Sequence, residues 1–413
     1  MSRKRRRVLF LHYTAPSILG GVEHVMGIHA RAARDAGDDV TIVAGRGTAP
    51  GVKLIRIPEL DSQFPAVLRD RAALARGEVT PQHALLAATI ERKLRPVLKR
   101  ADRIVVHNVF TLHLNAAFTE ALFALAAARP GVFVAWTHDL AWTDVQYKGQ
   151  RHEGRPWSLF ATAAPGVTYV AISKKSATEL SALTGLPLGK IAIVPNGVDR
   201  AAVLGLSTTG NRLATKLELF DADPLLLLPV RMTRRKRIEI AIDALAALRT
   251  RYPKAALVVT GGPGAHNPTN VSYEKELAAR AGPGVHLLHS EHVKIGVREL
   301  ADLYGLADAL VLPSANEGFG LPMLEAGLRR LPIICTDIPA LRENGGDEAT
   351  YVPLTADGAA WALAIDDKLT TLPIARQHRR ARQNEWPRIL AELVLPAIHG
   401  EGGERAERRE ATG

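Results

Sequence analysis

Two glutamates, Glu317 and Glu325, bracket a Gly-Phe-Gly-Leu-Pro run in the stretch ANEGFGLPMLEAG (residues 315–327). The turn between them consists of Gly318, Phe319, Gly320 and Leu321. Its glycines allow a sharp bend and a close approach of the backbone to a ligand. The helix predicted to start near Pro322 would offer unpaired amide groups and a positive dipole end, which suit a phosphate.

Carboxylates beside a phosphate site need another partner, because an ionised glutamate only accepts hydrogen bonds. A ribose diol or a sugar supplies hydroxyl donors. We expect Glu325 to bind the ribose of a nucleotide and Glu317 to bind the sugar to be transferred. The alternative is an ordinary turn followed by a surface glutamate.

Two cations follow another predicted strand, in the segment PVRMTRRKRIEIAIDAL. Arg231 ends the strand and Lys236 lies near the start of the next helix, where a diphosphate would lie. Fixed positive charge stabilises a departing diphosphate more than the bound substrate, and this difference accelerates a reaction. Arg234 and Arg235 are expected to face solvent or the acceptor.

The first half of the chain offers a glycine pair and a strand-end histidine. Gly20 and Gly21 open a helix, so their amides would face a donor phosphate or an acceptor. The spacing is not G-x-G-x-x-G, which argues against a nicotinamide cofactor. Glu23 either binds an acceptor hydroxyl or faces the helix dipole. His138 ends the strand of AWTHDLAW; a lone histidine of this kind is commonly structural.

Further strand-end residues are acceptor-side or donor-side candidates. Asp139 is adjacent to His138 and would steer the acceptor, while His107 and Asn108 end the strand RIVVHN. Gly262 follows the strand ALVVTGG and opens a loop, residues 262–274, with a donor-side role.

The sequence argues against a metal site and a disulfide. His286, His289 and His292 recur every third residue, and residues three apart on a strand point to opposite faces. The single cysteine, Cys335, excludes an internal disulfide and fits a reducing cytoplasm. We therefore expect neither a metal nor another cofactor.

Short apolar runs alternate with helical stretches along the chain, which predicts parallel sheets covered on both faces. The predicted strands are RVLFLHY, DVTIVAG, VKLIRIP, RIVVHN, FVAWTHD, VTYVAIS, KIAIVPN, LLLLPV, ALVVTGG, VHLLHS, ALVLPS and PIICTD. The pattern loosens over residues 200–224, which we interpret as a linker. The segment NEWPRILAELVLPAI predicts an amphipathic helix that packs back across the junction.

The chain has 413 residues, 47% hydrophobic and 23% charged, with a net charge of +11. This length predicts two or three domains. No apolar run is long enough for a spanning helix. The excess positive charge is compatible with nucleic acid, an anionic membrane or a phosphorylated substrate. The basic residues 3–7 are either a solvated flank or a contact with a membrane surface or the acceptor, so a peripheral location at the inner face of a membrane stays open.

Six segments, in this order, resemble family-four retaining glycosyltransferases of the GT-B fold. They are GGVEHVMGIHARAARDAGDDVTIVAG, HDLAW, VPNGVD, RMTRRKRIEIAIDALAAL, the E-x7-E pair of Glu317 and Glu325, and TDIPALRE. The resemblance implies that His138 contacts the reacting centre and that Arg231 and Lys236 bind the diphosphate. The family usually has glycine where this chain has Arg237, so the turn there is expected to differ.

The resemblance implies an α/β protein with two Rossmann-like domains facing across a cleft. We expect an acceptor-side domain at 1–205, a nucleotide-sugar domain at 206–384, a crossing helix at 385–400 that packs on the N-terminal domain, and a disordered tail at 401–413. The implied activity is metal-independent transfer of a hexose, from GDP-mannose or UDP-glucose, to a hydroxyl of an unknown acceptor with retention of configuration.

Two alternatives remain at this stage. One is an epimerase or phosphorylase of the same fold; no lysine stands out for the aldehyde cofactor of such phosphorylases. The other is a basic nucleic-acid-binding protein, although the basic residues are dispersed and no patch interleaves them with aromatic residues.

Overall fold

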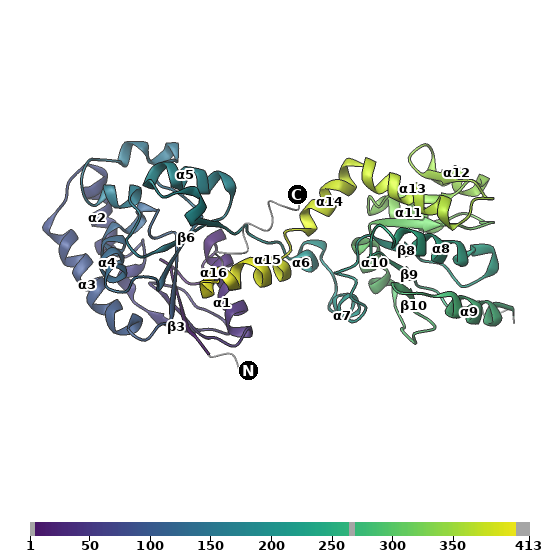
Figure 1. The fold of residues 1–413 in the computed structure, drawn as a ribbon, viewed down its shortest axis with the longest axis horizontal. Coiled ribbons are helices and arrows are strands. Elements are labelled where there is room, and N and C mark those ends of the chain that lie inside the picture. The colour runs from purple at the N-terminus through teal and green to yellow at the C-terminus, as the bar shows by residue number, and fades with distance from the viewer. Residues whose placement is uncertain (1–4, 264–268, 402–413) are drawn as a thin grey trace. The chain divides into compact units, whose positions relative to one another are not determined.

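A computed structural model describes residues 5–263 and 269–401 of the chain (Figure 1). The chain divides into two compact units. Unit 1 comprises Met1–Gly197 with Asn384–Gly413, and unit 2 comprises Val198–Gln383. Most of the predicted tail, residues 402–413, lies outside the described residues, as does the segment 264–268 of the predicted donor-side loop.

Unit 1 is built on a parallel sheet whose seven strands, within the described residues, run in the order β3-β2-β1-β4-β5-β6-β7. The strands are Arg7–Leu11 (β1), Asp39–Ala44 (β2), Lys53–Arg56 (β3), Arg103–His107 (β4), Phe133–Thr137 (β5), Thr168–Ala171 (β6) and Ile191–Ile193 (β7). The main helices are Gly21–Asp35 (α1), Pro65–Ala75 (α2), Pro81–Leu98 (α3), Ala116–Ala127 (α4) and Lys174–Thr184 (α5). Each strand falls in a predicted run, because central strands buried on both faces are continuously apolar.

The C-terminal segment packs on unit 1. It consists of Trp386–Ile389 (α15), a π-helical turn Leu390–Val394 (η7) and Leu395–His399 (α16). Trp386 and Ile398 are buried in the same core cluster as Phe10 of β1. His399 Nε2 also lies 2.7 Å from an oxygen of Asp38, and both side chains are buried. In Figure 1 this yellow segment lies beside the purple helix α1, which η7 contacts.

Unit 2 contains a second parallel sheet, with six strands in the order β10-β9-β8-β11-β12-β13 among the described residues. The strands are Leu225–Leu228 (β8), Ala256–Val259 (β9), Val285–Leu287 (β10), Ala309–Leu312 (β11), Ile333–Thr336 (β12) and Thr350–Val352 (β13). The helices after β8 are Ile238–Leu248 (α8), Thr269–Arg280 (α9), Val297–Leu306 (α10), Leu321–Leu328 (α11), Pro339–Gly345 (α12), Gly358–Thr371 (α13) and Pro373–Arg382 (α14). The two sheets confirm the α/β class, while β13 was not predicted.

Residues 200–224, which the sequence suggested as an irregular linker, contain two helices, Arg200–Leu204 (α6) and Thr208–Lys216 (α7). Leu213 is buried in the core of unit 2, and the Ser207 hydroxyl donates to a carboxylate oxygen of Asp302 in α10 at 2.5 Å. Packing against α10 therefore orders a segment that Gly205, Thr208, Thr209 and Gly210 make look irregular in the sequence.

The N-terminal basic cluster is partly neutralised by acidic side chains. Arg6 donates to Glu401 at 3.1 Å, and Arg5 and Arg7 lie within 4.0 Å of Asp39. Arg3 and Lys4 of the predicted cluster lie outside the described residues. In the part of the chain that the structure describes, every helix is too short or too polar to cross a bilayer.

Candidate functional site

Lys236 and Glu317 form a buried ion pair between two strand ends of unit 2. The Lys236 ammonium donates to Glu317 Oε1, and the two side chains are only 10% and 7% exposed. The Ser314 hydroxyl donates to the same oxygen at 2.8 Å, and Arg235 lies 3.6 Å from Oε2. Burial lowers the pKa of Lys236, and the carboxylate opposes this shift only in part. Two of the predicted site residues are thus in direct contact.

Arg235 is exposed, as the sequence suggested, and it also holds the turn that carries Glu317. Its guanidinium donates to the Asn316 carbonyl at 3.0 Å, and its own carbonyl accepts from the Ala315 amide at 2.7 Å. The loop after β8 and the loop after β11 are therefore tied together through backbone groups.

The glycine turn before α11 has one glycine that the conformation requires. Gly320 has φ +86°, and a Cβ added there would lie 2.8 Å from Leu341 Cδ2. Gly318 faces open space, while Phe319 and Leu321 are exposed. The Phe319 carbonyl accepts a hydrogen bond from Asn344. Helix α11 begins at Leu321, one residue before the predicted start, and in its first turn Leu321 and Leu324 are exposed while Met323 is buried.

Glu325 lies one turn into α11 and is half-buried. Its Oε2 accepts a hydrogen bond from the Tyr304 hydroxyl of α10. Burial, with the carboxylate second, raises the pKa of Tyr304, so this phenol stays a donor. The tyrosine fixes one carboxylate oxygen of Glu325 and leaves the other available.

Arg231 and Gly262 lie side by side at the carboxyl ends of β8 and β9. The amide of Met232, next to Arg231, donates to the Gly262 carbonyl at 3.0 Å. A Cβ on Gly262 would lie 2.3 Å from the ring of His289, so glycine is needed where these loops converge. Arg231 itself is exposed, and within the described residues it has no hydrogen-bond or ion-pair partner. Its guanidinium is therefore free to bind an anion.

Arg237 adopts a backbone conformation that favours glycine, with φ 47° and ψ 47°. Its side chain donates to the Leu354 carbonyl at 2.6 Å. Arg237 therefore occupies a left-handed conformation that glycine adopts more readily, and its side-chain hydrogen bond helps to hold it there.

In unit 1, His138 contacts a second histidine at the end of the neighbouring strand. His107 Nδ1 lies 3.0 Å from His138 Nε2, and the rings stack with centroids 5.3 Å apart. Burial lowers the pKa of His107 well below its usual range and that of His138 to about 3, so both rings are neutral near pH 7.

The burial of His107 fixes the position of the proton. Its Nε2 is buried without a hydrogen-bond partner, and a stranded N–H there would be costly. Placing the hydrogen on Nδ1 lets His107 donate to His138 instead. The neutral His138 ring then carries its own hydrogen on Nδ1, which makes it a hydrogen-bond donor rather than a base.

Glu23 folds back over the start of α1. It accepts a hydrogen bond from the Thr14 hydroxyl and lies 3.6 Å from His12 Nε2. Burial raises the pKa of Glu23, but the hydrogen bonds from His12 and Thr14 outweigh it and bring the value to about 2. A Cβ on Gly20 would lie 2.1 Å from Glu23 Oε2, so glycine leaves room for this carboxylate. Gly21 is the exposed first residue of α1.

Asn108 positions the segment that carries His138 and Asp139. Its side-chain oxygen accepts from the amides of His138 at 2.7 Å and Asp139 at 3.0 Å, and its Nδ2 donates to Asp139 Oδ2 at 2.8 Å. Because Asn108 is buried and these hydrogen bonds use its amide group, it supports the turn. Asp139 is exposed and faces a pocket.

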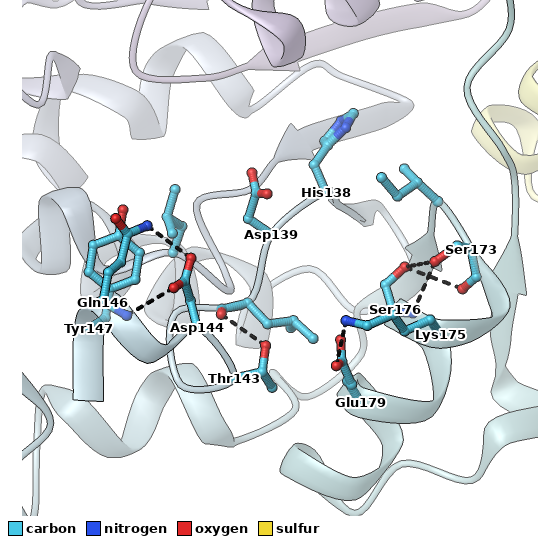
Figure 2. A pocket seen from close by; sticks show the side chains of 13 residues that line it. His138, Asp139, Thr143, Asp144, Gln146, Tyr147, Ser173, Lys175, Ser176 and Glu179 are labelled. Carbon is cyan, nitrogen blue, oxygen red and sulfur yellow. Dashed lines mark hydrogen bonds and ion pairs between the residues drawn. The ribbon is translucent and has the colours of Figure 1, made fainter.

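A pocket of about 520 Å³ lies in unit 1 at the carboxyl ends of β5 and β6 (Figure 2). It is lined by Leu112, His138, Asp139, Leu140, Thr143, Asp144, Gln146, Tyr147, Ile172, Ser173, Lys175, Ser176 and Glu179. Figure 2 shows Asp144 and Gln146 at one side and the α5 residues Lys175 and Glu179 at another. Its volume suits a small ligand.

Sequence reasoning missed His12, Ser173, Tyr304 and Ser314. His12 lies near the end of the predicted run RVLFLHY, and Ser314 and Ser173 end the runs ALVLPS and VTYVAIS. The expectation applied to His138, that ligands lie at the carboxyl ends of parallel strands, could therefore have found all three. Tyr304 lies inside a helix, and no local signal marks it.

Two family models match the chain in succession. The family described as Glycosyltransferase Family 4 matches residues 19–202, and the family described as Glycosyl transferases group 1 matches residues 211–382.

Curated relatives match over part of their length. A D-inositol 3-phosphate glycosyltransferase of Xylanimonas cellulosilytica is 32% identical over 252 residues, 59% of each chain. A mannosylglucosylglycerate synthase of Petrotoga mobilis is 26% identical over 265 residues, 59% of this chain and 61% of the relative. The chain thus matches about three fifths of the length of these relatives. A crystal structure of a glycosyltransferase from Rickettsia africae ESF-5 is 15% identical with a TM-score of 0.38, covering 96% of this chain and 98% of that one.

Proposed function

Because this chain belongs to the family-four glycosyltransferases of the GT-B fold, we propose that it transfers a hexose from a nucleoside-diphosphate sugar to an acceptor hydroxyl. The donor is of the GDP-mannose or UDP-glucose type, and the anomeric configuration is retained. The observation that carries this proposal is the buried contact between Lys236 and Glu317, next to the glycine turn that opens α11.

Unit 2 binds the donor in this proposal. The diphosphate lies against Arg231, Lys236 and the amide groups of residues 318–321, since these supply positive charge and hydrogen-bond donors. Glu325 accepts from the ribose diol with the oxygen that Tyr304 leaves available. Glu317 accepts from the sugar hydroxyls with Oε2.

The reaction replaces one bond at the anomeric carbon with another on the same face. The bond from this carbon to the phosphate oxygen breaks, and the acceptor oxygen forms the new bond. The acceptor proton passes to the departing phosphate. Arg231 and Lys236 stabilise the charge that grows on the diphosphate, so they lower the barrier. His138 donates from Nδ1 to an oxygen near the reacting centre. We propose that no divalent metal is needed, because these side chains provide the positive charge.

A panel of nucleoside diphosphates and their sugars tests the donor, since a bound ligand raises the melting temperature by mass action. The stabilising donor is then tested for transfer, with the anomeric configuration of the product read by NMR and with a chelator present in parallel. Loss of transfer in chelator would contradict the metal-independent part. A chain that no nucleotide stabilises would contradict the whole proposal.

Lys236→Ala tests the site itself. We expect turnover to fall at least ~100-fold, which corresponds to about 2.7 kcal/mol of lost transition-state stabilisation. Lys254→Ala is the matched control. Lys254 is exposed and precedes β9, so it lies at the amino end of this strand, whereas the proposed site lies at the carboxyl ends of the strands. Turnover near wild type in Lys236→Ala would remove this lysine from the mechanism.

A further inference from the structure

The pocket of unit 1 carries an excess of negative charge, although the chain as a whole has a net charge of +11. Its lining includes the carboxylates of Asp139, Asp144 and Glu179 and the single ammonium of Lys175. Lys175 is bound to Glu179 at 2.6 Å, one turn along α5. The lining therefore has a surplus of two negative charges.

Asp139 and Asp144 are the source of this surplus. Within the described residues neither has a cationic partner; Asp139 accepts from the amide of Asn108, and Asp144 accepts from the backbone and side-chain nitrogens of Gln146 at 3.0 and 2.8 Å. These bonds come from neutral groups, so they orient the carboxylates without cancelling their charge. His138 adds no positive charge, because its buried ring is neutral near pH 7.

The remaining polar groups suit hydroxyl-rich ligands. Asp139 Oδ1 has no hydrogen-bond partner in the part of the chain that the structure describes, so it is available to a hydroxyl donor. The ring of His138 supplies a donor on its Nδ1, which also lacks a partner among those residues. Tyr147 and Gln146 add a flat wall and an amide. Acceptors and donors of this kind bind the vicinal hydroxyls of a sugar or cyclitol.

We propose that this pocket binds the acceptor and selects a polyhydroxylated molecule that carries no phosphate or carboxylate. The inference rests on the proposed function, since it names the substrate class that receives the sugar. A phosphate in the pocket would be repelled by the uncompensated carboxylates of Asp139 and Asp144. The ammonium of Lys175 could bind the phosphate only by breaking its ion pair with Glu179. An amino group on the acceptor would be favoured for the same electrostatic reason.

The test compares acceptors that differ in charge. Transfer from the donor selected above is measured with glucosamine, glucose and glucose 6-phosphate, and with myo-inositol and D-inositol 3-phosphate. Binding of the same compounds is measured by calorimetry on the full chain. We expect each phosphorylated compound to be at least ~10-fold weaker than its neutral counterpart, about 1.4 kcal/mol. Glucosamine should be at least as good as glucose.

Two variants separate the pocket from general effects of charge. Asp144→Lys reverses one charge at an exposed position that bonds only within its own turn, so the fold should be unaffected. It should reduce the preference for the neutral compounds at least ~5-fold. Glu153→Gln removes a carboxylate from an exposed position of unit 1 that does not line the pocket, and it should leave the preference unchanged.

The outcomes distinguish this inference from the proposed function. If a nucleotide sugar binds but the phosphorylated compounds are preferred, or if Asp144→Lys leaves the ratio unchanged, the inference is wrong and the transferase proposal stands. Failure of all the unphosphorylated compounds to bind or to accept sugar also overturns the inference. If no nucleotide sugar binds, the proposed function is wrong.

Discussion

Replacing Lys236 with methionine would leave the Glu317 carboxylate buried without its closest cation. Methionine keeps the apolar stem, so the change removes charge with little loss of volume. Breaking one side of a buried ion pair typically costs about 3–5 kcal/mol. Glu317 retains the Ser314 hydroxyl and the more distant Arg235, so we expect a smaller loss, about 2–3 kcal/mol in unit 2.

The double variant Lys236→Met with Glu317→Gln should recover part of this loss, because no uncompensated charge remains. We expect a coupling free energy of about 1.5–2 kcal/mol between the two positions. The assay is amide hydrogen exchange read by mass spectrometry on peptides from β8 and β11, which reports opening of unit 2 separately from unit 1. Transfer should be lost in the single and double variants alike.

Lys175 and Glu179 provide a matched pair for this cycle. They are also a lysine and a glutamate in direct contact, but their side chains are 81% and 31% exposed. Solvent screening limits such a pair to about 0.3–0.5 kcal/mol. A coupling free energy between Lys236 and Glu317 no larger than that of this control pair would show that burial does not strengthen the ion pair.

Three further changes test local features of the two units. His83 has a pKa raised to about 9, because hydrogen bonds to Asp70 and Glu120 outweigh the effect of burial. Its contribution to stability should be complete below about pH 6.5 and lost as pH rises through 9. Thermal melts of His83→Phe should lack this alkaline loss. Gly320→Ala should destabilise unit 2 by about 2 kcal/mol, since it combines a left-handed backbone with a contact on Leu341, and a melting temperature equal to wild type would contradict this. The free energy of unfolding of Arg237→Gly should stay within about 0.5 kcal/mol of wild type. That of Arg237→Val should fall by about 1–2 kcal/mol, because β-branched residues disfavour the left-handed conformation of this position. Equal denaturation midpoints for the two variants would contradict a left-handed backbone at residue 237.

The strands were predictable where burial on both faces makes a continuous apolar run. β8, Leu225–Leu228, is fully buried, and its short apolar run ends at a proline, which favoured a strand. β13 has three residues, Thr350–Val352, and a single buried one, so its sequence resembles a loop. Its place at the edge of the sheet, paired only with β12, explains this weak pattern.

The helices within residues 200–224 were likewise not predictable from the local sequence pattern. Helix α7 contains Thr208, Thr209, Gly210 and Asn211, which are poor helix formers. Its stability comes from Leu213 and Ala214 in the core and from the Asp302 carboxylate, which accepts from Ser207 at its N-terminus. Contacts from a distant part of the chain decide this structure, and a local pattern does not contain them.

For the site, the expectation that ligands lie at the carboxyl ends of parallel strands identified which segments carry polar groups. It did not show which of these groups contact one another. Lys236 and Glu317 were assigned to different parts of a donor, yet they contact each other across 81 residues of sequence. Asn108 was expected on the acceptor side, and its amide instead holds the 138–139 segment. Spacing gives the location of a side chain along the chain, whereas its partner depends on which strands are neighbours in the sheet.

The charge of the chain illustrates why composition misleads about a ligand. A net charge of +11 suggested an anionic partner, but Arg5, Arg6 and Arg7 lie within ion-pair distance of acidic side chains. The pocket of unit 1 has the opposite sign because Asp139 and Asp144, which follow β5, lie in its lining with no cationic partner among the described residues. Coulomb interactions fall within about one Debye length, ~8–10 Å, so a bound acceptor responds to these few neighbours far more than to distant arginines. The chemistry of the acceptor should therefore follow the local carboxylates, which the topology assembles and the total charge conceals.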